Sequence, residues 1–171
     1  KRKRYLNYPT YGFGLLASNA ISLGIDVKII NLQNSVLKSC LKSKNEDEFD
    51  FEKAWKFSIK DYDPDLIALT CMFSQTHQSL IEVSEHLGKI FPETPQIAGG
   101  VHITNLLIQQ EIHDIFVRDL PFIKIFMLYE ADSAFKDFLK FILKYEKNLT
   151  QIFIKDVGFF ENRNIPSSED L

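Results

Sequence analysis

Short apolar segments alternate with helical patterns along most of this chain. The segments at residues 66–71 ("LIALTC"), 95–100 ("PQIAGG") and 123–129 ("IKIFMLY") have the length and composition of strands. Amphipathic segments at residues 78–91 and 133–145 follow the first and the third. A strand, a helix and a second strand in this order form a right-handed crossover within a parallel sheet. The alternation therefore predicts an α/β fold with helices on both faces of the sheet.

The N-terminal third extends this pattern. Residues 12–24 are predicted to form a helix that ends at Gly24, and the β-branched residues 25–32 a strand. A first strand would cover residues 4–8, although "KRKRYLNY" is more basic than a central strand should be. Further helices are expected at residues 35–43, 49–61 and 103–112. The uninterrupted apolar run at residues 66–71 is typical of a strand buried on both faces.

The C-terminal segment has a different pattern. Residues 149–163 alternate by two around Asp156-Val157-Gly158, which predicts a β-hairpin. Residues 164–171 are polar and are expected to be a linker. The predicted fold is a flavodoxin-like (Rossmann-like), doubly wound parallel sheet of five strands. It would occupy residues 1–148, with the hairpin packed on it.

Composition excludes several classes of protein. The chain has 171 residues, 45% of them hydrophobic, which is enough for one domain with its own core. Its net charge is −3, and basic residues cluster only at residues 1–4, so a nucleic-acid partner is not expected. There is no run of 18 apolar residues and no signal-peptide pattern, and the two cysteines are far apart in sequence. We therefore expect a cytoplasmic protein that contacts no membrane.

Ligands of open parallel sheets bind beyond the carboxyl ends of the strands. The segments expected there are "NYPTYGFG", "CMFSQT", "GGVHIT" and "YEADS". They supply small, hydroxyl and amide groups, but none combines two acids with a histidine. His77, His86 and His113 lack metal-ligand spacing and are interpreted as surface residues. The pattern predicts a crevice that holds a large ligand, with no catalytic and no metal-binding residue.

In their order and spacing these segments resemble the N-terminal cobalamin-binding domain of cobalamin-dependent radical S-adenosylmethionine enzymes. The similarity covers about residues 8–170, and "GGVHIT" is its most specific part, because the family repeatedly carries Gly-Gly-x-His there. "PTYGFGLL", "GIDVKIINL" and "PDLIALTCMFSQT" resemble the family's first loop, second strand and third strand with its loop. "IPSSEDL" resembles the linker into the radical domain, which this chain lacks, since two cysteines cannot form CxxxCxxC.

The resemblance implies that cobalamin is bound base-off for a radical enzyme, most often a methyltransferase. In the full-length protein it also implies a [4Fe-4S] cluster and S-adenosylmethionine, held by a radical domain in cis. In the related DxHxxG motif a histidine ligates cobalt, and a gapless match places Pro9 at that position. The implied cofactor-binding residues are Pro9, Tyr11, Gly12, Cys71, Met72, Phe73, Ser74, Gln75, Thr76, Gly99, Gly100, Val101, His102, Tyr129 and Glu130.

Several of these residues have simpler interpretations. Gly99-Gly100 would serve a tight turn, His102 a structural hydrogen bond, and residues 74–76 the cap of the following helix. The segment Tyr129-Glu130-Ala131-Asp132 also departs from the family, which usually carries Gly-Glu-x-Glu there, and Ala131 gives the backbone less freedom than glycine would. Two other functions stay open: a cofactor-free domain that binds a protein partner, and a domain that binds FMN or another nucleotide.

Overall fold

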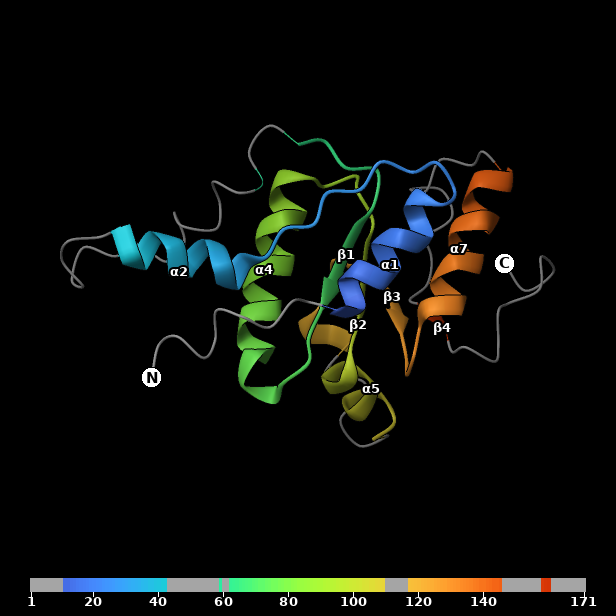
Figure 1. Ribbon diagram of the computed structural model, residues 1–171. Coiled ribbons are helices and arrows are strands. Elements are labelled where there is room, and N and C mark those ends of the chain that lie inside the picture. Colours follow the sequence, from blue (N-terminus) through green and yellow to red (C-terminus); the bar gives the residue numbers. More distant parts are fainter. Residues whose placement is uncertain (1–10, 43–58, 60–61, 110–116, 146–157, 161–171) are drawn as a thin grey trace. The chain divides into compact units, whose positions relative to one another are not determined.

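The computed structural model describes residues 11–42, 59, 62–109, 117–145 and 158–160 (Figure 1). The chain divides into two compact units, Lys1–Tyr62 and Asp63–Leu171. The predicted first strand at residues 4–8 and almost all of the predicted helix at residues 49–61 lie outside the described residues.

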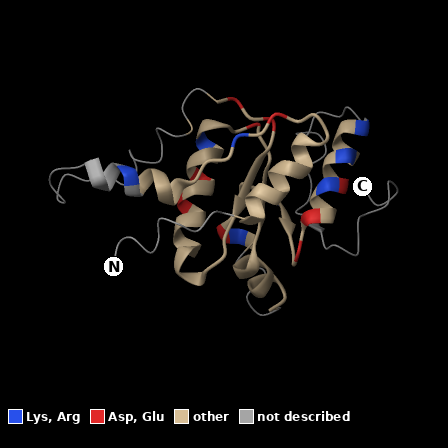
Figure 2. Ribbon diagram, in the orientation of Figure 1, with Lys and Arg blue, Asp and Glu red and all other residues tan. Residues whose placement is uncertain are grey.

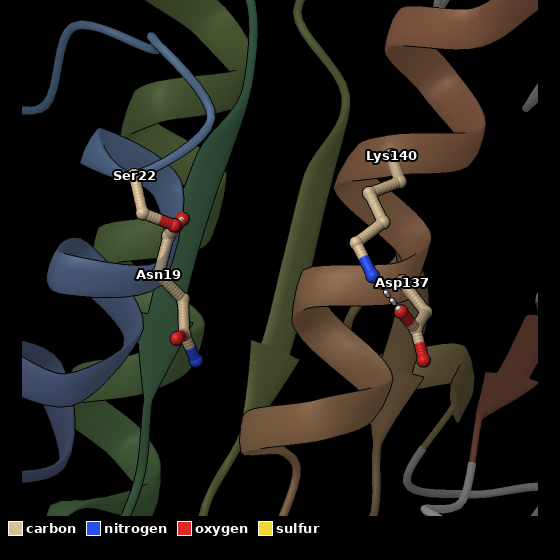
Figure 3. A network of polar contacts seen from close by, with 4 residues as sticks. All are labelled: Asn19, Ser22, Asp137 and Lys140. Carbon is tan, nitrogen blue, oxygen red and sulfur yellow. Dashed lines mark hydrogen bonds and ion pairs between the residues drawn. The ribbon is translucent and has the colours of Figure 1, made fainter.

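In the first unit, helix α1 spans Tyr11–Ile21, so the predicted helix is present but ends three residues before Gly24. Gly24 has a φ of 81°, and its N–H donates to the carbonyl of Ile21 at 2.9 Å. The N–H of Ile25 donates to the carbonyl of Ala20 at 3.2 Å. This pair of bonds is a Schellman motif, in which a glycine adopts the left-handed conformation that ends the helix. The Ser22 hydroxyl also donates to the Asn19 carbonyl at 2.7 Å (Figure 3).

The strand predicted at residues 25–32 is not present. Residues 25–31 have no strand assignment, and helix α2 begins at Leu32 and ends at Lys42. Asn31 caps this helix, because its side-chain oxygen accepts a hydrogen bond from the Asn34 N–H at 2.9 Å. A strand exists only with a hydrogen-bonded neighbour, and in the described part of the chain the sheet consists of β1 to β4.

The second unit contains a parallel sheet in the order β1-β2-β3-β4, with strands Ile67–Thr70, Gln96–Gly99, Ile123–Met127 and Gly158–Phe160. All three pairings are parallel. Helix α4 (His77–Ile90) connects β1 to β2, α5 (Val101–Leu107) follows β2, and α7 (Asp132–Tyr145) follows β3. The α/β class and the parallel sheet were predicted from the alternation, and the structure confirms both.

Two details of the sheet differ from the prediction. Gly158, expected in the turn of a hairpin, is the first residue of β4 and pairs in parallel with Ile125 of β3. The described residues thus show a fourth parallel strand and no hairpin. Strand β1 is not buried on both faces, because Ala68 and Thr70 are exposed while Ile67 and Leu69 are partly buried. As the end strand of the described sheet, β1 has a hydrogen-bonded neighbour on one side.

The core of the second unit lies between the sheet and its helices. Phe126 and Ile103 are fully buried, and Leu80, Leu107 and Leu120 pack in the same cluster. A buried polar pair lies in this unit: the Ser84 hydroxyl donates to Gln96 Oε1 at 2.8 Å, and Gln96 Nε2 donates to the Ser84 carbonyl at 3.0 Å. Because each partner satisfies the other, α4 is fixed to the first residue of β2.

The solvent-facing side of α7 carries an ion pair between Lys140 and Asp137 at 2.8 Å (Figure 3). Both side chains are about half exposed, so the pair contributes little to stability. None of the described helices is both long and apolar enough to cross a membrane.

Candidate functional site

The carboxyl ends of three strands form one edge of the sheet. Thr70 of β1 pairs with Gly99 of β2, and Gly99 pairs with Met127 of β3. The residues that follow these three positions therefore lie at the same edge, at the lower end of the sheet in Figure 1, where α4 and α5 begin. This edge, made by residues 71–77, 99–104 and 128–132, is called the strand-end site. It contains most of the residues that sequence predicted to bind a ligand.

The loop after β1 contains a buried thiol. Cys71 is buried, and its Sγ lies 3.5 Å from the Phe73 carbonyl and 3.4 Å from Thr76 Oγ1. Its backbone N–H donates to the Gly99 carbonyl at 3.0 Å, which extends the β1–β2 pairing by one step. The buried Cys71 side chain thus stabilises its own loop and is not accessible to a ligand.

Residues Ser74–Thr76 form a short 3₁₀ helix, η4, that leads directly into α4. The predicted side-chain cap is wrong: Thr76, at the N-cap of α4, makes no side-chain bond to the helix. Its hydroxyl donates backwards to the Phe73 carbonyl at 2.8 Å. The η4 turn occupies the place where a capping loop was expected, while Ser74 and Gln75 stay exposed.

The glycine pair has a structural explanation. Gly100 has φ 111° and ψ 163°, a region that is essentially restricted to glycine. A Cβ on Gly100 would lie 2.5 Å from the Cys71 carbonyl oxygen and 2.9 Å from Thr70 Oγ1. At Gly99 a Cβ would lie 3.1 Å from the Met127 carbonyl oxygen. The backbone that approaches these glycines therefore belongs to neighbouring strands, and the pair by itself does not require a ligand.

His102 lies in the first turn of α5, which starts two residues earlier than predicted. Its exposed fraction is 7%. Its Nδ1 lies 3.3 Å from Ser74 Oγ, and its Nε2 lies 3.2 Å from Nδ1 of His77. The two imidazoles meet edge to face, with centroids 5.1 Å apart. His102 therefore joins the loop after β2 to the loop after β1.

Burial lowers the pKa of His102 below its ordinary value of 6.5, and the neighbouring His77 lowers this pKa further. Both effects disfavour the imidazolium, because burial removes water from the charge and His77 repels it. At neutral pH His102 is thus an uncharged hydrogen-bonding group.

Sequence reasoning missed His77. It was interpreted as a surface residue, but it is half-buried at the first position of α4 and contacts His102. A signal was present, since His77 and His102 each lie in the first turn of the helix that follows one of two consecutive strands. In a parallel sheet such positions lie side by side.

The loop after β3 is tied to α5. The Tyr129 N–H donates to Thr104 Oγ1 at 2.9 Å, and this hydroxyl lies 3.3 Å from the Gly100 carbonyl. Tyr129 has a φ of 57°, a left-handed conformation that is uncommon for a residue with a side chain. Glu130 is exposed beside it.

Four large apolar side chains of the strand-end site face solvent. Their exposed fractions are 48% for Met72, 66% for Phe73, 53% for Val101 and 56% for Tyr129. They come from three neighbouring loops, and Met72 and Phe73 are not core residues. Several exposed apolar side chains at one edge are typical of a surface that binds a ligand or a partner.

The remaining predicted residues lie in the first unit or beyond the described residues. Tyr11 and Gly12 are the first two residues of α1, so Tyr11 is helical and not in a loop, and its side chain is exposed. A Cβ on Gly12 would meet no atom within 4 Å. Pro9 lies outside the described residues.

Charge is sparse at the strand-end site. Residues 71–77, 99–104 and 128–132 contain no Lys or Arg, and their acids are Glu130 and Asp132. In Figure 2 the first turn of α4 and the whole of α5 show neither blue nor red, so they carry no charged residue. Within the described ranges, no group of three or more His, Cys, Asp or Glu residues could hold a metal ion. Comparison of the chain with protein-family models, curated proteins and solved structures found no match.

Proposed function

We propose that this domain binds cobalamin in the base-off form at the strand-end site. The observation that carries the proposal is the group of exposed apolar side chains, Met72, Phe73, Val101 and Tyr129, on three consecutive loops at the carboxyl edge of a parallel sheet. A corrin ring is broad and flat with an apolar face, and burial of such side chains would favour its binding. Two of these loops, residues 71–76 and 99–104, are among the segments that resemble the cobalamin family.

The strand order supports the flavodoxin-like part of the proposal. In a sheet ordered 2-1-3-4-5, the third, fourth and fifth strands are neighbours in sequence order. The described strands β1, β2 and β3 have this order, and β4 pairs with β3 beyond them. We therefore propose that the second unit has a flavodoxin-like sheet.

The polar groups of the strand-end site fit the rest of the cofactor. Ser74 and Gln75 are exposed beside Phe73, and a hydroxyl and an amide can bond the corrin amides and the ribose of the nucleotide tail. Bound cobalamin would supply methyl-transfer chemistry, while the chain's own residues hold and orient it. We further propose that the rest of the enzyme is a cytoplasmic radical S-adenosylmethionine domain in cis.

Cobalt would have no histidine from this chain beneath it. The resemblance places Pro9 at the axial position, and proline offers no donor. His102 and His77 already bond one another and begin helices at the β1 and β2 loops. The cobalt(II) form should therefore lack nitrogen superhyperfine splitting in its electron paramagnetic resonance spectrum. Splitting that disappears in His77→Ala or His102→Ala would refute this part of the proposal.

A domain that binds a protein partner is the second candidate, because the same exposed apolar side chains would suit a protein interface. Equilibrium dialysis with hydroxocobalamin and with FMN separates the candidates. We expect about one cobalamin per chain and little FMN. Retention of FMN alone would favour the nucleotide-binding alternative, and retention of neither would favour the partner protein.

A matched pair of variants tests the position of the site. Phe73→Glu places a charge among the exposed apolar residues, whereas Ile90→Glu places the same charge on a side chain of comparable exposure, 45%, at the last residue of α4. Phe73→Glu should weaken cobalamin retention at least tenfold, and Ile90→Glu should leave it unchanged. Equal cobalamin retention by both variants would mean that the cofactor does not bind at this edge.

A further inference from the structure

A chain of three polar side chains runs through the strand-end site. Ser74 is exposed, His102 is buried behind it, and the half-buried His77 bonds the far nitrogen of His102. These three residues are called the Ser74–His102–His77 relay. They join the loop after β1 to the first turn of α5. A ligand at this place must therefore meet the relay.

The relay has two neutral arrangements. In one, the Ser74 hydroxyl donates to His102 Nδ1, and His102 Nε2–H donates to His77 Nδ1. In the other, His77 Nδ1–H donates to His102 Nε2, and His102 Nδ1–H donates to Ser74 Oγ, so the serine proton is free to point outwards. The second arrangement offers a donor to an acceptor at the surface.

One extra proton selects the outward arrangement. If both nitrogens of His102 carry protons, Nδ1–H donates to Ser74 and Nε2–H donates to His77, while the Ser74 proton points out. A second extra proton would set two N–H groups against each other across the 3.2 Å between the rings. The relay can therefore take up one proton, and doing so creates a cation and an outward donor together.

An anion at this site would have no other positive side chain in its loops. Residues 71–77, 99–104 and 128–132 contain no Lys or Arg. The titratable groups on the surrounding elements are His77 on α4, Cys71 after β1, Tyr129 and Glu130 after β3, and Asp132 at the start of α7. Of these, His77 acts on the pKa of His102. A phosphate ester is the anionic part of both the cobalamin tail and FMN.

We infer that the strand-end site binds a phosphate ester through Ser74 and the two histidines, with uptake of one proton by the relay. The inference rests on the proposed function for its ligand. In the free domain His102 is neutral at neutral pH, and a bound phosphate would favour the imidazolium. Between the free and the bound pKa of the relay, affinity should thus rise as pH falls, by at most about tenfold per pH unit, because one proton is linked to binding.

The test is the dissociation constant of hydroxocobalamin measured from pH 5 to pH 8, beside cobinamide, the corrinoid that lacks the nucleotide tail and its phosphate. We expect cobalamin to bind more tightly at low pH and cobinamide to show no such slope. FMN, measured in the same series, identifies the source of the phosphate. His102→Asn, which keeps a hydrogen-bonding group but cannot titrate, should bind cobalamin without pH dependence.

The outcomes separate the two proposals. Cobalamin binding that is independent of pH, or an equal slope for cobinamide, would overturn the relay and leave cobalamin binding intact. A pH dependence of cobalamin affinity that persists in both His102→Asn and His77→Asn would also overturn the relay. FMN binding whose pH dependence is lost in His102→Asn, without any cobalamin binding, would support the phosphate site and refute cobalamin as the ligand. The variant is needed because the FMN phosphate itself titrates near about pH 6. Absence of binding for all three compounds at every pH would overturn both proposals.

Discussion

Gly100→Ala tests whether the fold alone requires the glycine pair. Its φ of 111° and ψ of 163° lie in a region that costs a non-glycine residue roughly 1–3 kcal/mol. The new Cβ would also lie 2.5 Å from the carbonyl oxygen of Cys71, a backbone atom that cannot turn aside. Since this carbonyl accepts the His102 N–H at 3.2 Å, relief of the clash would disturb that bond as well. We expect a loss of about 3–4 kcal/mol in the free energy of unfolding.

The adjacent glycine is the matched control. Gly99 does not have a positive φ, and a Cβ there would lie 3.1 Å from the Met127 carbonyl oxygen, so Gly99→Ala needs a shift of only a few tenths of an ångström. We expect it to cost about 1 kcal/mol. Urea unfolding followed by far-ultraviolet circular dichroism measures both. Equal losses in the two variants, or a loss below about 0.5 kcal/mol for Gly100→Ala, would refute the steric explanation.

Three further predictions concern side chains of the second unit. Ser84→Ala leaves the buried Gln96 amide without its partner hydroxyl and should lower the free energy of unfolding by about 1–3 kcal/mol in urea titrations; no loss would mean that the pair is dispensable. Thr104→Val removes the acceptor of the Tyr129 N–H and should cost about 1–2 kcal/mol, with faster amide exchange at Tyr129; unchanged exchange there would contradict the contact. The pKa of His102 is lower in the folded than in the unfolded chain, so the unfolded state binds the proton first. Stability should thus fall as pH drops from the unfolded toward the folded pKa, and His102→Asn should reduce this slope; an unchanged slope in the variant would assign it to other groups.

Sequence predicted the parts of the fold that local chemistry determines. The end of α1 depends on Gly24, and the strands β1, β2 and β3 depend on apolar runs bounded by Pro or Gly, so each could be located from a few neighbouring residues. The prediction of a strand at residues 25–32 was wrong, because β-branched composition does not indicate whether a neighbouring strand is available for pairing. The parallel pairing of Gly158 with Ile125 was not predicted for the same reason, since it joins residues 33 positions apart.

The candidate site shows the same division. Three of the four segments expected at this edge follow β1, β2 and β3 and lie there, because the carboxyl ends of parallel strands meet at one edge, whereas Tyr11 and Gly12 of the fourth segment belong to the first unit. The contacts of single residues could not be predicted, because they join different loops. Gly100 is required by the Cys71 carbonyl, and His102 is held by Ser74 and His77. None of these contacts joins neighbours in the sequence.

Hydrogen–deuterium exchange with and without hydroxocobalamin locates the bound cofactor on the domain. We expect saturating cobalamin to slow exchange in residues 71–77, 99–104 and 128–130, and to leave the C-terminal half of α4, at the other end of the sheet, unchanged. Protection confined to other segments, or no protection under conditions in which cobalamin is retained, would contradict the placement of the cofactor at the strand-end site.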